Sequence, residues 1–178
     1  MTTFPIDREV PVVRVADTLA EKSMTLGNIL TAEQIIPELT ATERWSVIVE
    51  LTDLLIVQGK INASDRDAVL AALKAREETM STGIGLGIAI PHASSECVSQ
   101  VVAAFGRSQK GIEFDSLDNM PVQFVVLFVS PKDQAQTHLR TLAAIAKFLN
   151  DRTVREKLAS ATSPGEILTI FGGEAQVK

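Results

Sequence analysis

The sequence has only one cysteine, Cys97, two histidines and no tyrosine among its 178 residues. Because a lone cysteine has no partner within the chain, an intramolecular disulfide is excluded. A secretory signal peptide is not expected either, since Asp7, Arg8 and Glu9 interrupt the apolar stretch that it would need. We therefore expect a cytoplasmic protein. The scarcity of histidine, cysteine and tyrosine also leaves few side chains that can act as acid, base or nucleophile near neutral pH.

Long apolar runs and an excess of positive charge are missing as well. The most apolar segment, residues 122–130, is followed by Pro131 and Lys132 and is far shorter than the roughly 20 residues that cross a bilayer. The formal net charge is -5 and the pI is about 5.1, so the long-range field repels the phosphates of nucleic acids and of anionic membranes. Nucleic-acid binding and direct membrane insertion are not expected, which leaves proteins and small molecules as partners.

Residues 24–178 have the size and composition of one compact domain. Hydrophobic residues make up 46% of the chain and charged residues 22%, which suits a sizeable apolar core. Residues 1–23 differ, because they combine charges, Pro5, Pro11 and a β-leaning run at residues 10–15 without helical periodicity. We interpret residues 1–23 as an N-terminal arm attached to this domain.

Two helices are predicted in the first half of the domain. Apolar residues recur at helical spacing from Thr40 to Gly59, and Thr40 followed by Glu43 has the pattern of a capping box. A second helix is expected to begin at Ser64 and to end before Gly83, with apolar and charged residues on opposite sides. Each helix therefore has one face to bury.

Strands and further helices are predicted in the second half. Residues 101–105 and 122–129 are rich in β-branched and aromatic residues, and the second run is apolar throughout, as in a strand buried on both faces. Helices are then expected at residues 137–150, 151–159 and 163–171. Strands interleaved with helices favour an α/β fold, a three-layer sandwich in which a mixed β-sheet is flanked by helices on both faces.

The segment STGIGLGIAIPHA at residues 81–93 is the most unusual in the chain. Its three alternating glycines let backbone N–H groups approach a ligand without interference from a Cβ atom. A short apolar strand follows, and Pro91 is expected to break it and to present His92 in an open environment at the strand end. A neutral imidazole in such a place is a good phosphoryl acceptor.

A nucleotide site and a metal site are the alternatives. Glycine-rich loops also cradle nucleotide phosphates, but the spacing here is G-x-G-x-G, and neither G-x-G-x-x-G nor a terminal G-K-[ST] is present. A non-catalytic module that binds a nucleotide or another small ligand through this loop is the alternative function. The histidines have no Cys, Asp or Glu at a recognised metal-ligand spacing, so no metal and no cofactor are expected.

Arg76 and His138 are the candidate partners of His92. His138 lies at the start of the helix predicted at residues 137–150, where the helix N-terminus favours anions and a neutral imidazole could donate a hydrogen bond to a phosphoryl oxygen. The guanidinium of Arg76 could supply the positive fork that a transferring phosphoryl group needs. Taken singly, these residues also fit ordinary roles, as a turn histidine, a solvent-facing helix residue and a surface arginine.

These segments resemble the A component of the bacterial phosphoenolpyruvate-dependent sugar phosphotransferase system, fructose/mannitol type. The resemblance runs from about residue 25 to residue 171 and includes Arg76-Glu77, STGIGLGIAIPHA and GIEFDSLDNMPVQFVVLFVSPKDQAQTHLRTLAAIAKFLNDRTVREKL. The last block is most similar to the nitrogen-regulatory branch, enzyme IIA of the nitrogen phosphotransferase system. Ala93 stands where members of that branch often have glycine, and residues 1–23 have no recognisable counterpart.

The resemblance implies an EIIA type-2 phosphotransferase domain at residues 24–178. His92 would accept a phosphoryl group at Nε2 from an HPr-type or nitrogen-HPr-type phosphohistidine protein. Arg76 and His138 would flank that group, and Ser81 and Thr82 would be weaker hydrogen-bonding candidates. The group would then pass to the cysteine of an EIIB subunit during sugar uptake, or would act as a switch that decides which target protein is bound.

Overall fold

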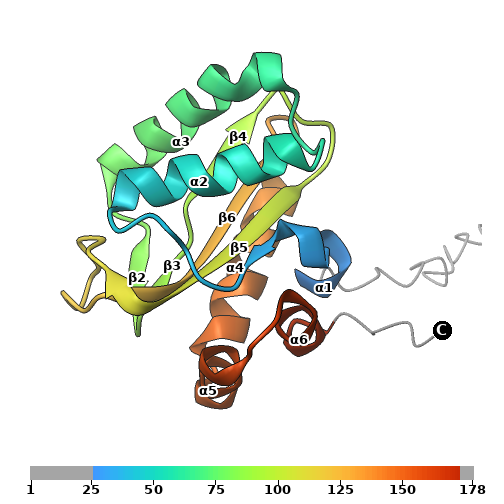
Figure 1. Ribbon diagram of the computed structural model, residues 1–178. Helices are drawn as coiled ribbons and strands as arrows, with labels where there is room; N and C mark the ends of the chain where they lie inside the picture. The colour runs from blue at the N-terminus through green and yellow to red at the C-terminus, as the bar shows by residue number, and fades with distance from the viewer. Residues whose placement is uncertain (1–25, 173–178) are drawn as a thin grey trace, which may run out of the picture.

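The computed structural model describes residues 26–172 (Figure 1), so the arm predicted at residues 1–23 lies outside the described residues. Three short elements come first: α1 (Leu26–Ile29), η1 (Ala32–Gln34) and β1 (Ile35–Ile36). The other helices are α2 (Arg44–Val57), η2 (Ala63–Asp65), α3 (Arg66–Thr79), α4 (Ala135–Asn150), α5 (Arg152–Ser160) and α6 (Pro164–Ile170). The other strands are β2 (Gly83–Gly85), β3 (Ile88–Ala89), β4 (His92–Ser95), β5 (Val102–Ile112) and β6 (Val122–Pro131).

The strands form one mixed sheet in the order β1-β5-β6-β3-β2, and β4 also pairs with β6. β5 and β6 are antiparallel, whereas β3 and β4 follow one another along the same edge of β6 and run parallel to it. Pro91, which lies between β3 and β4, therefore interrupts the hydrogen-bond ladder without ending the sheet. His92 is the first residue of β4 and lies opposite Phe128 of β6.

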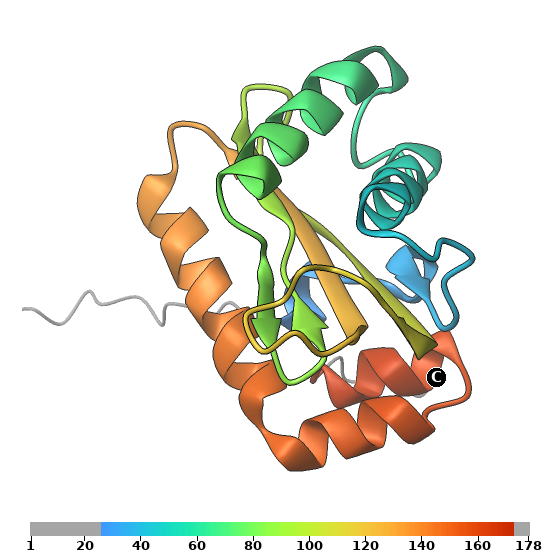
Figure 2. The same cartoon turned by 90° about the vertical axis from the view of Figure 1, so that its left-hand side faces the viewer.

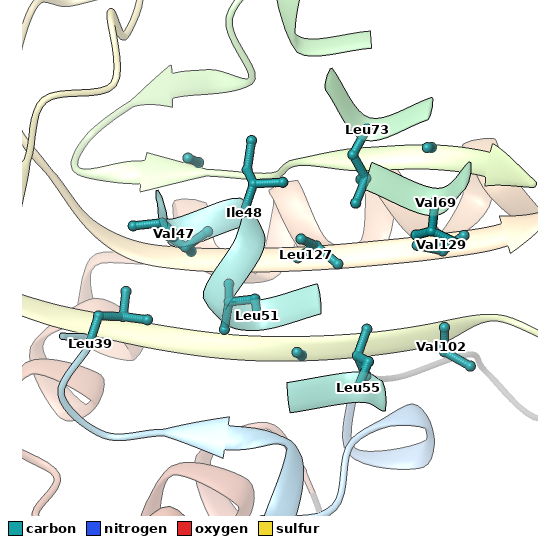
Figure 3. Close-up of a cluster of buried hydrophobic side chains, with 14 of the residues drawn as sticks. Leu39, Val47, Ile48, Leu51, Leu55, Val69, Leu73, Val102, Leu127 and Val129 are labelled. Atoms are coloured by element: carbon teal, nitrogen blue, oxygen red, sulfur yellow. The ribbon is translucent and has the colours of Figure 1, made fainter. Parts of the chain in front are cut away.

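Helices cover both faces of the sheet (Figure 2). α2 and α3 pack on one face, where their buried aliphatic side chains meet those of the strands (Figure 3). The second face is covered by α4, α5 and α6, whose buried side chains form a second apolar cluster with those of the strands. These two buried layers confirm the predicted three-layer α/β sandwich with a mixed sheet.

Strand β6 explains why both layers are apolar. Side chains alternate between the two faces of a strand, and in β6 both sets are buried. Val125, Leu127 and Val129 lie in the layer of α2 and α3, and the side chains between them lie in the layer of α4 to α6. Among the helices of residues 26–172, none combines the length and apolar character that a membrane span requires.

The starts of two helices differ from the predictions. Thr40 does not form a capping box with Glu43, because its N–H and hydroxyl both donate to the carboxylate of Glu50 and α2 begins only at Arg44. Nor does Ser64 cap α3, which begins at Arg66 after the turn η2. At Thr40 the cause is a contact with a residue farther along the chain, and at Ser64 it is the short 3-10 helix η2 that precedes α3.

The predicted starts of α5 and α6 are correct. One strand is longer than predicted, and three short elements were not predicted. Asp151 accepts hydrogen bonds from two backbone N–H groups of α5, and Ser163 accepts one from Glu166 at the start of α6. Strand β5 continues beyond residue 105 to Ile112, which pairs with Val122. The elements α1, η1 and β1 are too short to have a detectable period, and the sequence did not predict them.

Replacing Leu51 in the layer of α2 tests this packing. Leu51 is 0% exposed, so Leu51→Ala should lower the free energy of unfolding by about 2–5 kcal/mol, through lost burial and a residual cavity. Urea unfolding followed by circular dichroism measures it. Val57→Ala is the control in the same helix: Val57 is 79% exposed, and its loss should change the free energy of unfolding by less than about 0.5 kcal/mol. Equal effects of the two changes would contradict this orientation of α2.

Candidate functional site

His92 is fixed by the backbone on both sides of Pro91. The N–H of Ile90 donates to the carbonyl of Thr82, and the N–H of Phe128 donates to the carbonyl of Pro91. The imidazole stacks on the ring of Phe128, with 5.5 Å between ring centroids and 12° between ring planes. His92 is only 6% exposed, so the expected open environment is wrong. It is buried because the sheet continues through β4, which places the side chain in the layer covered by α4.

Arg76 reaches the imidazole from the last turn of α3. Its side chain is half-buried, its Nη1 donates to the carbonyl of Met80 at 2.9 Å, and its Nε donates to Nε2 of His92 at 3.2 Å. The Met80 carbonyl therefore holds one end of the guanidinium while the other end faces the histidine.

These contacts determine the tautomer of His92. An arginine only donates hydrogen bonds, so Nε2 of His92 must accept and therefore has no proton. The proton of the neutral ring is on Nδ1, which donates to the carbonyl of Ile90 at 2.7 Å. The lone pair of Nε2 is thus directed at the guanidinium, and Nε2 is the unprotonated nitrogen of this ring.

His138 approaches from the first turns of α4. Its ring centroid lies 5.2 Å from that of His92. Its Nδ1 lies 2.7 Å from Oγ of Ser130 and 3.2 Å from Oγ of Ser94. Arg76, His92 and His138, which are far apart in the sequence, thus meet at one place from α3, β4 and α4.

The surroundings lower the pKa of both histidines, which favours the neutral form of each ring. Burial is the main cause that lowers the pKa of His92, and the hydrogen bond to Ile90 acts in the opposite direction. The charge of Arg76, and that of His138 when it is protonated, lower the pKa further. Burial is also the main cause that lowers the pKa of His138, and the charge of Arg76 lowers it further. A neutral His92 keeps the lone pair that a nucleophile needs.

The glycine segment forms a tight hairpin rather than a phosphate cradle. Gly85, Leu86 and Gly87 have φ of 93°, 58° and 75°, in the left-handed region where glycine is favoured. The N–H of Leu86 donates to the carboxylate of Asp118 at 2.8 Å. A carboxylate at this N–H repels an anion, and no hydrogen bond of the described residues brings this turn to the histidines. The structure therefore gives no support to the expectation that the N–H group of Leu86 approaches an anionic ligand.

Ser81 and Thr82 make structural hydrogen bonds. The hydroxyl of Ser81 donates to the carbonyl of Phe114 at 2.7 Å, and that of Thr82 donates to the carboxylate of Glu77 at 2.6 Å. Glu77 is 2% exposed and also accepts the N–H of Thr82, so it ties the loop after α3 to the helix itself. No hydrogen bond of the described residues joins either hydroxyl to His92 or His138.

Several residues of the site were not identified from the sequence. Phe128 stacks on His92, and the hydroxyls of Ser94 and Ser130 contact Nδ1 of His138. Buried Glu77 accepts from the N–H of Thr82 in the loop after α3 that also contains Met80. The parallel register of β4 and β6, which places Ser94 opposite Ser130, brings the two hydroxyls together. Sequence patterns contain no signal for this register.

The arrangement suits transfer of an anionic group to Nε2 of His92. An unprotonated Nε2 can attack, and a guanidinium and a second imidazole beside it can stabilise negative charge on the group received. Within residues 26–172, no three or more His, Cys, Asp or Glu side chains gather in a way that could hold a metal ion.

Comparison with known proteins points to the same chemistry. The family model described as phosphoenolpyruvate-dependent sugar phosphotransferase system, EIIA 2, matches residues 28–173. The fructose-specific EIIA component of the PTS system of Haloferax volcanii is 42% identical over 113 residues, which cover 64% of this chain and 72% of that protein.

The nitrogen-regulatory branch is also represented. A nitrogen regulatory protein of Klebsiella oxytoca is 32% identical over 152 residues, covering 85% of this chain and 92% of that protein. The crystal structure of nitrogen regulatory protein IIA-Ntr from Neisseria meningitidis superposes with a TM-score of 0.74 at 29% identity, covering 82% of this chain and 97% of that one. The similarity therefore extends to both sugar-specific and regulatory proteins.

Arg76→Gln should raise the pKa of both histidines, because the cation that disfavours imidazolium is removed. Titration of the imidazole ¹⁵N signals measures both values, and both should lie below 6.5 in the unaltered protein. The same shift affects stability: between the folded-state pKa and 6.5 the unfolded chain binds more protons, so the free energy of unfolding should fall as the pH drops below 6.5.

Arg152→Gln is the matched control for this titration. It also removes one arginine, but its side chain is 85% exposed and pairs with Glu156 on α5. Its loss should leave both histidine titrations where they were. Unchanged or lowered values in Arg76→Gln would contradict the contact between Arg76 and His92.

Proposed function

Because the chain belongs to the EIIA 2 family of the phosphoenolpyruvate-dependent sugar phosphotransferase system, we propose that it carries a phosphoryl group on Nε2 of His92. The observation that carries the proposal is the neutral, buried His92, whose Nε2 lone pair faces the guanidinium of Arg76. The carrier domain spans residues 24–178 in this proposal, with residues 1–23 as an arm, and the match to residues 28–173 supports that division.

The phosphoryl group comes from a phosphohistidine of an HPr-type or nitrogen-HPr-type protein. The bond between phosphorus and the donor imidazole breaks as the lone pair of Nε2 forms a bond to phosphorus, and the donor imidazole leaves with the electron pair. Bonds of the same kind are broken and formed, so little driving force is needed and the protein's main task is positioning. No metal takes part in this scheme.

Charge changes on both sides of the reacting ring. As Nε2 gives up its lone pair, positive charge develops on the imidazole, and the carbonyl of Ile90 that accepts from Nδ1–H stabilises it. The guanidinium must give up its bond to Nε2 during attack, and it can then donate to the phosphoryl oxygens. The carbonyl of Met80 keeps Nη1 of Arg76 in place during this exchange.

The surroundings of His92 restrict the approach of water to its ring. Phe128 covers one face of the imidazole, and His92 is only 6% exposed. Water that reached the phosphoryl group would hydrolyse it and waste the transfer. The apolar side of the site is therefore part of the proposed mechanism.

The similarity supports two uses of the loaded carrier. In one, the cysteine of an EIIB subunit accepts the group, and the similarity to a fructose-specific EIIA component favours this use. In the other, the phosphorylated and unphosphorylated forms bind different target proteins, and the similarity to a nitrogen regulatory protein favours this use. Loading of His92 is common to both, so it is the step to test first.

The structure gives less support to a small-ligand or nucleotide module. Such a module would use the N–H groups of the glycine segment, but that of Leu86 is occupied by Asp118. Thermal stabilisation by nucleotides without any transfer to His92 would favour that alternative.

His92→Gln should abolish phosphorylation. Intact-mass spectrometry at mildly alkaline pH, after mixing with phosphoenolpyruvate, enzyme I and an HPr-type carrier, should show one acid-labile phosphoryl group on the unaltered protein and none on His92→Gln. Arg76→Ala should slow labelling about a hundredfold, because a charged donor to the transferring group is lost. His138→Ala should slow it about tenfold, as expected for one weaker donor.

Arg152→Ala is the control for these rates, since it removes an exposed arginine of α5, and it should label at the rate of the unaltered protein. Undiminished labelling of His92→Gln would overturn the proposed site. Absence of labelling with every HPr-type donor would overturn the proposed function.

Two exposed apolar side chains flank the site and are suited to donor docking. Met80 follows α3 beside Arg76 and is 63% exposed, and Leu139 follows His138 and is 64% exposed. Apolar side chains next to a reacting centre can supply contact area to a protein partner. Met80→Asp or Leu139→Asp should therefore raise the KM for the donor about fivefold to tenfold, while kcat changes little.

Val57→Asp is the control for the docking surface. Val57 is 79% exposed at the C-terminal end of α2, which is joined by a short turn to the start of α3 and so lies far from the last turn of α3 that holds Arg76 (Figure 1). The KM of the Val57→Asp variant for the donor should equal that of the unaltered protein. Equal KM increases in all three variants would indicate a general effect of added negative charge and would contradict docking at this surface.

A further inference from the structure

The unusual feature of His138 is that two serine hydroxyls surround the same ring nitrogen. Oγ of Ser130 lies 2.7 Å from Nδ1, Oγ of Ser94 lies 3.2 Å from it, and the two hydroxyl oxygens are 3.2 Å apart. Ser130 is 0% exposed, whereas Ser94 is exposed and can also reach water. Only Ser130 must therefore find its hydrogen-bond partners within the protein.

The hydroxyl proton of Ser130 has two acceptors within hydrogen-bond distance, Nδ1 of His138 and Oγ of Ser94. Nδ1 of His138 is the nearer, at a distance typical of a strong hydrogen bond, and Ser94 is the more distant. If Ser130 donates to Nδ1, Ser94 can donate to Ser130, and all three groups are satisfied in one chain of hydrogen bonds. The distances also allow the hydrogen bonds to run in the opposite direction, from His138 to Ser130 and from Ser130 to Ser94, but the proton of His138 would then be on Nδ1.

We propose that Ser130 is a positioning residue that donates to Nδ1 of His138 and so holds that ring as the tautomer with its proton on Nε2. This inference rests on the proposed function, because it gives the tautomer its use. A ring protonated on Nε2 can donate a hydrogen bond to a phosphoryl oxygen on His92, whereas the other tautomer would direct a lone pair at that anion.

The surroundings are consistent with a neutral, donating His138. Its ring lies 5.2 Å from the ring of His92 and 5.2 Å from that of Phe128, so one side of it borders the reacting ring and another an apolar one. Burial lowers the pKa of His138, and the charge of Arg76, which disfavours a second positive charge in this space, lowers it further. A neutral imidazole has one N–H proton. If Nδ1 accepts a hydrogen bond, that proton is on Nε2, and Nε2 is the nitrogen that can donate.

The first test is the tautomer of His138 in the unphosphorylated protein. The chain has only two histidines, so ¹⁵N-histidine labelling gives a spectrum with two imidazoles that is simple to assign. Long-range ¹H–¹⁵N correlation at pH 8 should show a protonated Nε2 and an unprotonated Nδ1 for His138, and the opposite for His92. A protonated Nδ1 on His138 would overturn the proposal, and this measurement needs neither a variant nor a phosphoryl donor.

The second test removes the hydroxyl. Ser130→Ala should give a mixture of the two His138 tautomers and should slow phosphoryl transfer to His92 about tenfold, while the unfolding transition stays cooperative. Ser108→Ala is the control: Ser108 is 5% exposed on β5 and has no hydrogen bond to either histidine, so its loss should change neither readout. An unchanged tautomer in Ser130→Ala would contradict the proposed role even if the rate fell, since the rate alone would also respond to a packing defect.

These readouts separate the two proposals. The tautomer is measured without phosphorylation, so its failure leaves the phosphocarrier function standing. Conversely, the expected tautomer in a protein that no HPr-type donor labels would leave Ser130 as a positioning residue and would overturn the proposed function.

Discussion

The imidazole of His92 is held between a backbone carbonyl and a guanidinium, and the chemistry of the site depends on this arrangement. Arg76 can only donate, so Nε2 must accept, and the remaining proton must lie on Nδ1, where the carbonyl of Ile90 accepts it. Nε2 thus carries no proton, so no general base is needed to remove one before it attacks. Burial and the nearby positive charge keep the ring neutral, and so keep the lone pair available.

The sheet supplies the precision that this arrangement needs. β3 and β4 both pair with β6, and Pro91 lies between them. The carbonyl of Ile90, on one side of Pro91, accepts from Nδ1 of His92 on the other side. The parallel register also places Phe128 under the ring of His92 and Ser130 beside His138. Because strands buried on both faces are rigid, groups attached to them hold their positions better than groups on loops.

The long elements and the three central residues could be predicted from the sequence, because their signals are local or are carried by motifs. Helical periodicity and the apolar run of β6 indicate the layers, and the segment before His92 resembles a known family. The capping box predicted at Thr40 was wrong, because the carboxylate of Glu50, ten residues later in the sequence, accepts from the N–H and the hydroxyl of Thr40. The role of the glycine turn depends on Asp118, and the contacts of Ser130 depend on strand register, so neither is visible in the sequence.

The central claim is that Nε2 of His92 is the atom that receives the phosphoryl group. The most direct measurement is a ¹H–¹⁵N–³¹P correlation spectrum of the ¹⁵N-histidine-labelled protein after phosphorylation by the donor system. The account predicts one phosphorus bonded to Nε2 of His92, with Nδ1 still protonated and His138 unmodified. A phosphorus bonded to Nδ1 of His92, or to either nitrogen of His138, would contradict it.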